Sequence, residues 1–136
     1  MEDTQSTEDH PGGGPRPLTD ILEDLKKPIP ERLLESKKLS GNEITYVPWH
    51  RAQKIFGYYT RGFWEYQVID KREIGDDFCM TVEITVHCAE GAFTRQGTGR
   101  EAMGVDSFGD PQSNAESMAF RRAAVKWGLG IDLYEG

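Results

Sequence analysis

Hydrophobic residues recur at every second position in the middle of the chain, over residues 64–68 and again over residues 78–88. A period of two is that of a strand with one buried face and one solvent-exposed face. A polar turn at 75–77 joins these two segments, and the turn at 90–91 leads into a third, residues 93–102. Such tight connections favour antiparallel pairing. The pattern therefore predicts a three-strand antiparallel β-meander.

Helical spacing of apolar residues occurs on both sides of this meander. Leucine and isoleucine residues at i, i+3, i+4 and i+7 within residues 18–25 predict a short amphipathic helix, which the prolines that follow end. A further helical turn is expected over residues 31–38, and a short strand over residues 44–47. Pro48 is suited to the first turn of a helix that ends at Gly57. A last helix is predicted over residues 112–127.

Together these elements predict an α+β domain, an antiparallel three-strand β-meander plus a short strand with helices packed on one face. Residues 1–17 are acidic, rich in glycine and proline and aperiodic, so we expect a disordered tail before a single domain over residues 18–136. No apolar run approaches the roughly 20 residues of a membrane span, and the N-terminus lacks the pattern of a secretion signal. We therefore expect a cytoplasmic protein without a membrane partner, with Cys79 and Cys88 reduced.

Acidic residues outnumber basic ones, 23 to 16, and give a formal net charge of −7. The excess is uneven: residues 1–36 hold nine acidic and four basic side chains, a net of −5, whereas residues 37–136 hold fourteen and twelve, a net of −2. A nearly neutral domain can still bind a polyanion where its cations cluster, because screening over ~10 Å makes local charge decisive.

The last predicted helix carries such a cluster. Its face for docking on the sheet is formed by Ala119, Phe120, Ala123, Ala124 and Trp127, and the face directed away from the sheet by Arg121, Arg122, Val125 and Lys126. The guanidinium group is suited to bidentate contact with phosphate. The alternative, a solvated face whose cations only confer solubility, is equally compatible with this pattern.

Several short motifs resemble the N-terminal domain of the Rad52 family of single-strand annealing proteins. They are Pro30-Glu31, Ile44-Thr45-Tyr46, His50-Arg51, Phe56-Gly57-Tyr58 and Gly62-Phe63-Trp64, followed by the basic helix from Ala115 to Gly128. The resemblance covers about residues 18–134 and depends on the order and spacing of the motifs more than on any one of them.

The resemblance implies a homo-oligomeric ring whose groove holds the sugar-phosphate backbone of single-stranded DNA. Arg121 and Arg122 would hold phosphates, with Lys126 in the same basic set, and Ile44 and Tyr46 would lie near the nucleotides. Arg51 matches a position linked to DNA binding, although it could equally brace its helix. Ser36 stands where the family has an arginine, so Lys37 or Lys38 would replace it. A lysine of the family's second, outer DNA site falls near Asp77.

The expected function is that of a non-enzymatic protein of DNA double-strand break repair at the bacterial nucleoid. It would bind single-stranded DNA to protect 3′ ends or to support strand annealing, with other repair proteins as possible partners and with no cofactor or metal. The alternative is a structural or protein-interaction ring module, in which the arginines pair with acidic residues of a neighbouring subunit. A nuclease comes third, because the sequence offers no set of metal ligands.

Three further features have a structural interpretation. The aromatic residues between Tyr58 and Tyr66 are expected in the core rather than stacked on bases. The segment Gly97-Thr98-Gly99 is expected to form a bulge or a close approach between subunits. His50 and His87 have no partner at a catalytic spacing, so we expect structural roles for both.

Overall fold

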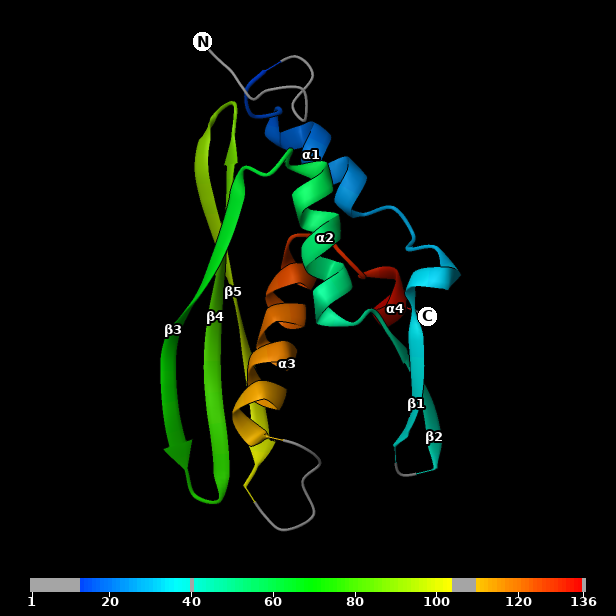
Figure 1. Cartoon of the computed structure of the whole chain (residues 1–136), viewed down its shortest axis with the longest axis vertical. Coiled ribbons are helices and arrows are strands. Elements are labelled where there is room, and N and C mark those ends of the chain that lie inside the picture. The colour runs from blue at the N-terminus through cyan, green and yellow to red at the C-terminus, as the bar shows by residue number, and fades with distance from the viewer. Residues whose placement is uncertain (1–12, 40, 104–109, 136) are drawn as a thin grey trace.

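The chain forms an α+β fold in which helices lie between two antiparallel sheets, as Figure 1 shows. The computed structural model describes residues 13–39, 41–103 and 110–135. The elements are α1 (Leu18–Leu25), the 3-10 turn η1 (Glu31–Leu33), β1 (Glu35–Leu39), β2 (Asn42–Tyr46), α2 (Trp49–Tyr59), β3 (Trp64–Ile74), β4 (Asp77–Cys88), β5 (Gly91–Ala102), α3 (Pro111–Lys126) and α4 (Asp132–Glu135). The predicted fold class is confirmed.

The larger sheet is the predicted meander, with strand order β3-β4-β5. In its central strand, the residues at every second position from Phe78 to Cys88 are buried and face the helices. Val68, Val82 and Gly97 lie opposite one another in the register of the three strands. A register shift between Val68 and Asp70 interrupts the pairing of β3 with β4. The period-two pattern thus identified both the strands and their buried face.

Helix α3 packs on this sheet through small residues. A Cβ atom at Gly97 would collide with the backbone of Ala123, and one at Gly99 would collide with the backbone of Ala115. The pairing of β4 with β5 runs without a register shift through both glycines. The expectation of a bulge or an inter-subunit approach is therefore wrong, because the two glycines admit the helix of their own chain.

An aromatic cluster joins α2, α3 and β3. The ring of Phe120 lies 6.2 Å from Phe56, 6.0 Å from Trp64 and 5.0 Å from Tyr66, in edge-to-face geometry. Aromatic pairs at such separations are favourable beyond the apolar area they bury. At the end of α3, the buried Trp127 donates from Nε1 to the carbonyl of Ile84 at 3.2 Å. These contacts confirm the predicted docking face of α3.

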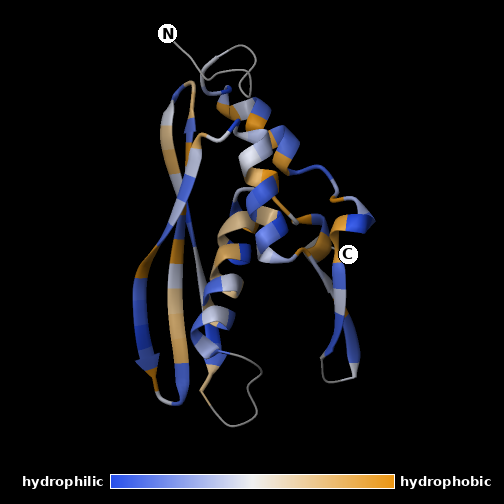
Figure 2. Ribbon diagram, viewed as in Figure 1, coloured by the Kyte–Doolittle hydropathy of each residue, from blue (hydrophilic) through white to orange (hydrophobic). Residues whose placement is uncertain are grey.

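The sequence-based expectation was wrong for residues 35–38, which form strand β1 rather than a helical turn. Strand β1 pairs with β2 in a separate two-stranded sheet, so the expected short strand belongs to a hairpin. Figure 2 shows that this hairpin is largely hydrophilic. A hydrophilic hairpin lacks the alternation that identified the strands of the meander.

Helix α2 continues past Gly57, where we expected its end, to Tyr59. The hydroxyl of Thr60 donates to the carbonyl of Phe56 at 2.7 Å, and the amide of Gly62 donates to the carbonyl of Gly57 at 2.8 Å. Gly62 has φ +85°, a conformation that favours glycine. These bonds satisfy the terminal carbonyls, so α2 ends at Tyr59, and Gly62 rather than Gly57 provides the glycine that follows the helix end.

The segment before α1 is attached to the larger sheet. The amide of Ala89 donates to the carbonyl of Arg16 at 2.8 Å. Pro17 occupies the N-cap of α1 without a side-chain acceptor, and Glu90 supplies one instead, since its Oε1 accepts from the amide of Leu18 at 2.9 Å. This bond lowers the pKa of Glu90. Most of the tail predicted over residues 1–17 lies outside the described residues.

Within the part of the chain that the structure describes, no helix is both long and apolar enough to cross a membrane.

Candidate nucleic-acid interface

The β1–β2 hairpin stands apart from the larger sheet, with α3 between them (Figure 1). Its register pairs Lys37 with Ile44 and Glu35 with Tyr46. Because residues directly opposite each other in a hairpin share a face, these four side chains lie on one face. Lys38 pairs with Glu43 and therefore lies on the other face.

A cavity of about 170 Å³ separates the hairpin from the helices. We call it the hairpin groove. Its lining is formed by Lys37, Ile44, Thr45, Tyr46, Val47, Ala52, Arg121, Ala124, Val125, Leu129, Gly130 and Leu133. Most of these residues are apolar, and they come from β2, α2, α3 and the segment after α3. The charged members are two cations, one from the hairpin and one from α3.

These two cations converge on one aromatic ring. The Nζ atom of Lys37 lies 5.2 Å from the centroid of the Tyr46 ring, and the Cζ atom of Arg121 lies 5.4 Å from it. Both distances are within the ~6 Å over which a cation is attracted to an aromatic face. The Nη1 atom of Arg121 also approaches the hydroxyl of Ser117 at 3.5 Å. The ring thus holds two positive groups at the groove, an arrangement that attracts an anion.

The structure therefore brings together four of the residues selected from the sequence, Lys37, Ile44, Tyr46 and Arg121. Lys37, rather than Lys38, faces the groove. The sequence analysis missed Leu129, Gly130 and Leu133, which complete the lining after α3, because no local pattern reveals that the chain returns to the hairpin there.

Arg122 and Lys126 do not line the groove. Arg122 donates from Nη1 to the carbonyl of Thr98 at 2.9 Å, so its side chain is directed to β5. Lys126 is exposed in the last turn of α3. The expectation that Arg121, Arg122, Val125 and Lys126 form one face away from the sheet is wrong, since consecutive helical residues are about 100° apart.

Arg51 lies at a different place from the groove cations. Its Nη2 atom is 3.6 Å from Oε2 of Glu35, and its side chain lines a second cavity beside α2. The hydroxyl of Tyr46 approaches Oε1 of the same glutamate at 3.4 Å. Glu35 therefore connects Arg51 with the ring at the groove.

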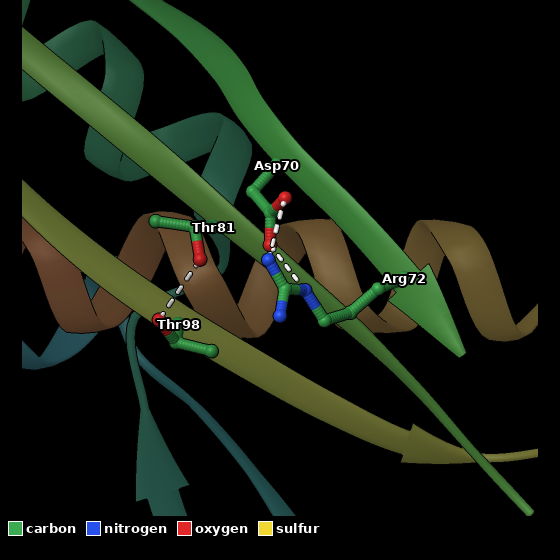
Figure 3. Close-up of polar contacts among 4 residues, drawn as sticks. All are labelled: Asp70, Arg72, Thr81 and Thr98. Carbon is green, nitrogen blue, oxygen red and sulfur yellow. Dashed lines mark hydrogen bonds and ion pairs between the residues drawn. The ribbon is translucent and has the colours of Figure 1, made fainter. Parts of the chain in front are cut away.

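The outer face of the larger sheet carries arginines that pair with carboxylates. Figure 3 shows Arg72 bound to Asp70 by two hydrogen bonds, of 2.8 and 3.2 Å, beside the bonded pair Thr81 and Thr98. Arg100 likewise contacts Asp77 at 2.7 Å. Each of these two arginines of the outer face is thus paired with a carboxylate.

Fold and groove together define a small α+β protein with a cationic, aromatic-lined groove between a hairpin and a helix. No family model matches the chain. Two proteins of Arabidopsis thaliana are similar to it. "DNA repair RAD52-like protein 1, mitochondrial" is 30% identical over 133 residues, which cover 96% of this chain and 76% of that protein. "DNA repair RAD52-like protein 2, chloroplastic" is 33% identical over 124 residues, which cover 88% of this chain and 61% of that protein.

The chain belongs to the family of RAD52-like DNA repair proteins. The family resemblance drawn from the motifs is thereby confirmed.

Proposed function

We propose that the protein binds the phosphate backbone of single-stranded DNA in the hairpin groove and acts in double-strand break repair without catalysing a reaction. The observation that carries this proposal is the convergence of Lys37 and Arg121 on the ring of Tyr46. The two cations suit the charged phosphates of a strand, and the apolar lining of the groove suits its uncharged sugars. Contact through phosphates leaves the base edges free, so sequence preference is slight.

The hairpin supplies a matched pair of variants for the test. Lys37→Ala and Lys38→Ala remove the same charge from adjacent positions of one strand, on opposite faces. We expect Lys37→Ala and Arg121→Ala each to weaken binding about tenfold, or about 1.4 kcal/mol, and Lys38→Ala to weaken it less than about twofold. Fluorescence anisotropy with a labelled oligothymidylate measures this. Equal losses for Lys37→Ala and Lys38→Ala would show unspecific attraction and contradict the proposal.

We further propose that copies of the chain assemble into a closed ring in which each subunit adds its groove to a common track. Strands β3 and β5, with 11 and 12 residues, are the edges of the larger sheet and have one side unpaired by other strands described in this chain. Such edges are available for pairing between subunits. A ring makes each later contact with the strand intramolecular and raises the affinity of the whole.

The biological role proposed for this ring is protection of 3′ ends, support of strand annealing, or both. A strand held with its base edges free can pair with a complementary strand, which serves annealing, and a covered end is withheld from nucleases. Within the family, the motifs resemble those of the bacterial DNA-damage-response protein A, and we propose that branch, with action at the bacterial nucleoid. A comparison of 3′-labelled and 5′-labelled strands in a nuclease digestion tests the end protection.

The second candidate is a structural ring module in which Arg121 pairs with a carboxylate of a neighbouring subunit. It is motivated by the acidic character of the chain, with a formal net charge of −7. Under this alternative, Arg121→Ala lowers the assembly mass measured by light scattering, and the parent protein shows no binding to single strands at moderate salt. Under the proposed function, the mass is unchanged and the affinity falls.

A further inference from the structure

A second cavity, of about 340 Å³, lies between α2 and the chain that joins α1 to η1. We call it the α2 pocket. Four cationic side chains and two tyrosines line it: Lys27, Arg32, Arg51, Lys54, Tyr58 and Tyr59. The hairpin groove lining includes none of these six residues.

The charges around the α2 pocket are only partly compensated. Lys27 pairs with Asp24 at 2.9 Å, and Arg51 lies 3.6 Å from Glu35. No carboxylate of the described residues forms an ion pair with Arg32 or Lys54. Both side chains are exposed. The pocket therefore attracts anions.

Helix α2 presents an aromatic ring in the same place. Tyr58 is 79% exposed and meets Tyr59 edge-to-face, with ring centroids 5.4 Å apart. Arg51, Lys54 and Tyr58 are spaced i, i+3 and i+7, so they form one stripe of the helix, whereas Phe56 is fully buried on another. The expectation that Tyr58 lies in the core is therefore wrong. Exposed aromatic rings beside cations hold single strands by stacking on bases and by contact with phosphates.

The α2 pocket is adjacent to the hairpin groove. Glu35 is shared between them, since one of its oxygens accepts from Tyr46 at 3.4 Å and the other lies 3.6 Å from Arg51. One carboxylate thus connects the two cationic sites. A negative charge at this point repels a phosphate that passes from one site to the other.

We propose that the α2 pocket is a nucleotide subsite in which a base of the bound strand stacks on Tyr58 while its phosphate contacts Arg32 and Lys54. The subsite rests on the proposed function, because it extends the strand held in the hairpin groove. Glu35 limits the affinity where the strand passes between the two sites.

The test of stacking uses two probes, an oligothymidylate of about 30 nucleotides and an abasic strand of the same length. The parent protein binds the oligothymidylate more tightly. Tyr58→Ala weakens binding of the oligothymidylate about fivefold or more and leaves binding of the abasic strand unchanged, whereas Tyr58→Phe retains the parent affinity for both. Equal effects of Tyr58→Ala on the two probes overturn the subsite.

Two further variants test the charges. Glu35→Gln strengthens binding of the oligothymidylate about two- to fivefold, because it removes the repulsion between the sites, and Lys54→Ala weakens binding of both probes. An unchanged affinity of Glu35→Gln contradicts the path between the sites. A change of assembly mass in Tyr58→Ala, measured by light scattering, identifies the pocket as a contact between copies and overturns the proposal.

Failure of the subsite is distinguishable from failure of the proposed function. If Arg121→Ala weakens binding about tenfold while Tyr58→Ala and Lys54→Ala do not affect it, only the subsite is wrong. If the parent protein binds neither probe, both are wrong.

Discussion

Adjacent residues of the same chemistry have different roles in this protein. Lys37 and Lys38 differ only in the face of β1 from which they project, and only Lys37 lies near the Tyr46 ring. The same holds on α3, where Arg121 lies near this ring and Arg122 donates to the carbonyl of Thr98. At the scale of the residue, the direction in which a side chain points decides which of two adjacent cations faces the groove.

Glycine has an equally local role where α3 crosses β5. We predict that Gly97→Ala lowers the free energy of unfolding by about 1–3 kcal/mol, because an added Cβ meets helix backbone that cannot rotate away as a side chain can. The midpoint of urea unfolding, followed by tryptophan fluorescence, measures the change.

Gly14→Ala is the control for this variant, since a Cβ at Gly14 has no neighbour within 4 Å. A Gly97→Ala protein as stable as the Gly14→Ala protein would show that the helix can move off the strand at little cost. The close packing of α3 on β5 would then not be required for stability.

At the scale of the element, the larger sheet and α3 could be predicted from the sequence and the hairpin could not. The strands of the meander have one buried face, so burial imposes the period of two that the sequence displays. Strand β1 is exposed at the four positions from Glu35 to Lys38, so no apolar alternation marks it as a strand. Its pairing with β2 is a contact between segments, which a local pattern does not encode.

The same distinction applies to the candidate site. Tyr46 was selected from the family resemblance and Arg121 from the cations of the last helix as well as from that resemblance, and the structure adds that the two side chains meet. The convergence required the turn of the chain after α3 and the placement of the hairpin opposite that helix. Both features bring together segments that are distant in the sequence. The spacing of residues within one helix or strand therefore could not reveal the groove.

The attachment of the segment before α1 is an element-scale feature that responds to pH. Asp24 contacts Lys27 at 2.9 Å and Arg16 at 2.7 Å. The hydrogen bond from Lys27 and that from Arg16 lower the pKa of Asp24 below 3.8, against the opposing effect of partial burial. A lowered pKa in the folded state stabilises the fold above the pKa of the unfolded chain, and this contribution is lost as the pH falls through the folded value.

We therefore predict that Asp24→Asn reduces the free energy of unfolding at pH 7 by about 0.5–1 kcal/mol. The difference from the parent protein shrinks as the pH falls below about 4, because the parent then loses the same charge. Urea unfolding at pH 7 and pH 3 measures both. Glu23→Gln, an exposed neighbour on the same helix, is the matched control. A difference that stays constant with pH would assign the effect to packing rather than to charge.

At the scale of the whole molecule, a net charge of −7 opposes the binding of a polyanion. Screening over ~10 Å restricts this repulsion to nearby charges, so the acidic residues distant from the groove contribute little at moderate salt. In the proposed function, the cations of the groove determine the affinity, and the proposed ring would multiply their number along one strand. Added salt should therefore weaken binding, as expected for cations that contact phosphates, despite the acidity of the chain.

The salt dependence of binding reports the number of phosphates that the protein neutralises, in addition to the affinity. Each phosphate neutralised on a single strand contributes about −0.7 to the slope of log K against log salt concentration. For a strand short enough to occupy one subunit, Arg121→Ala should make this slope shallower by about 0.7, while Lys38→Ala leaves it unchanged. Anisotropy titrations over a series of sodium chloride concentrations provide the slopes. A parallel displacement of the Arg121→Ala line, with weaker binding but the same slope, would mean that Arg121 holds the groove in shape instead of contacting a phosphate.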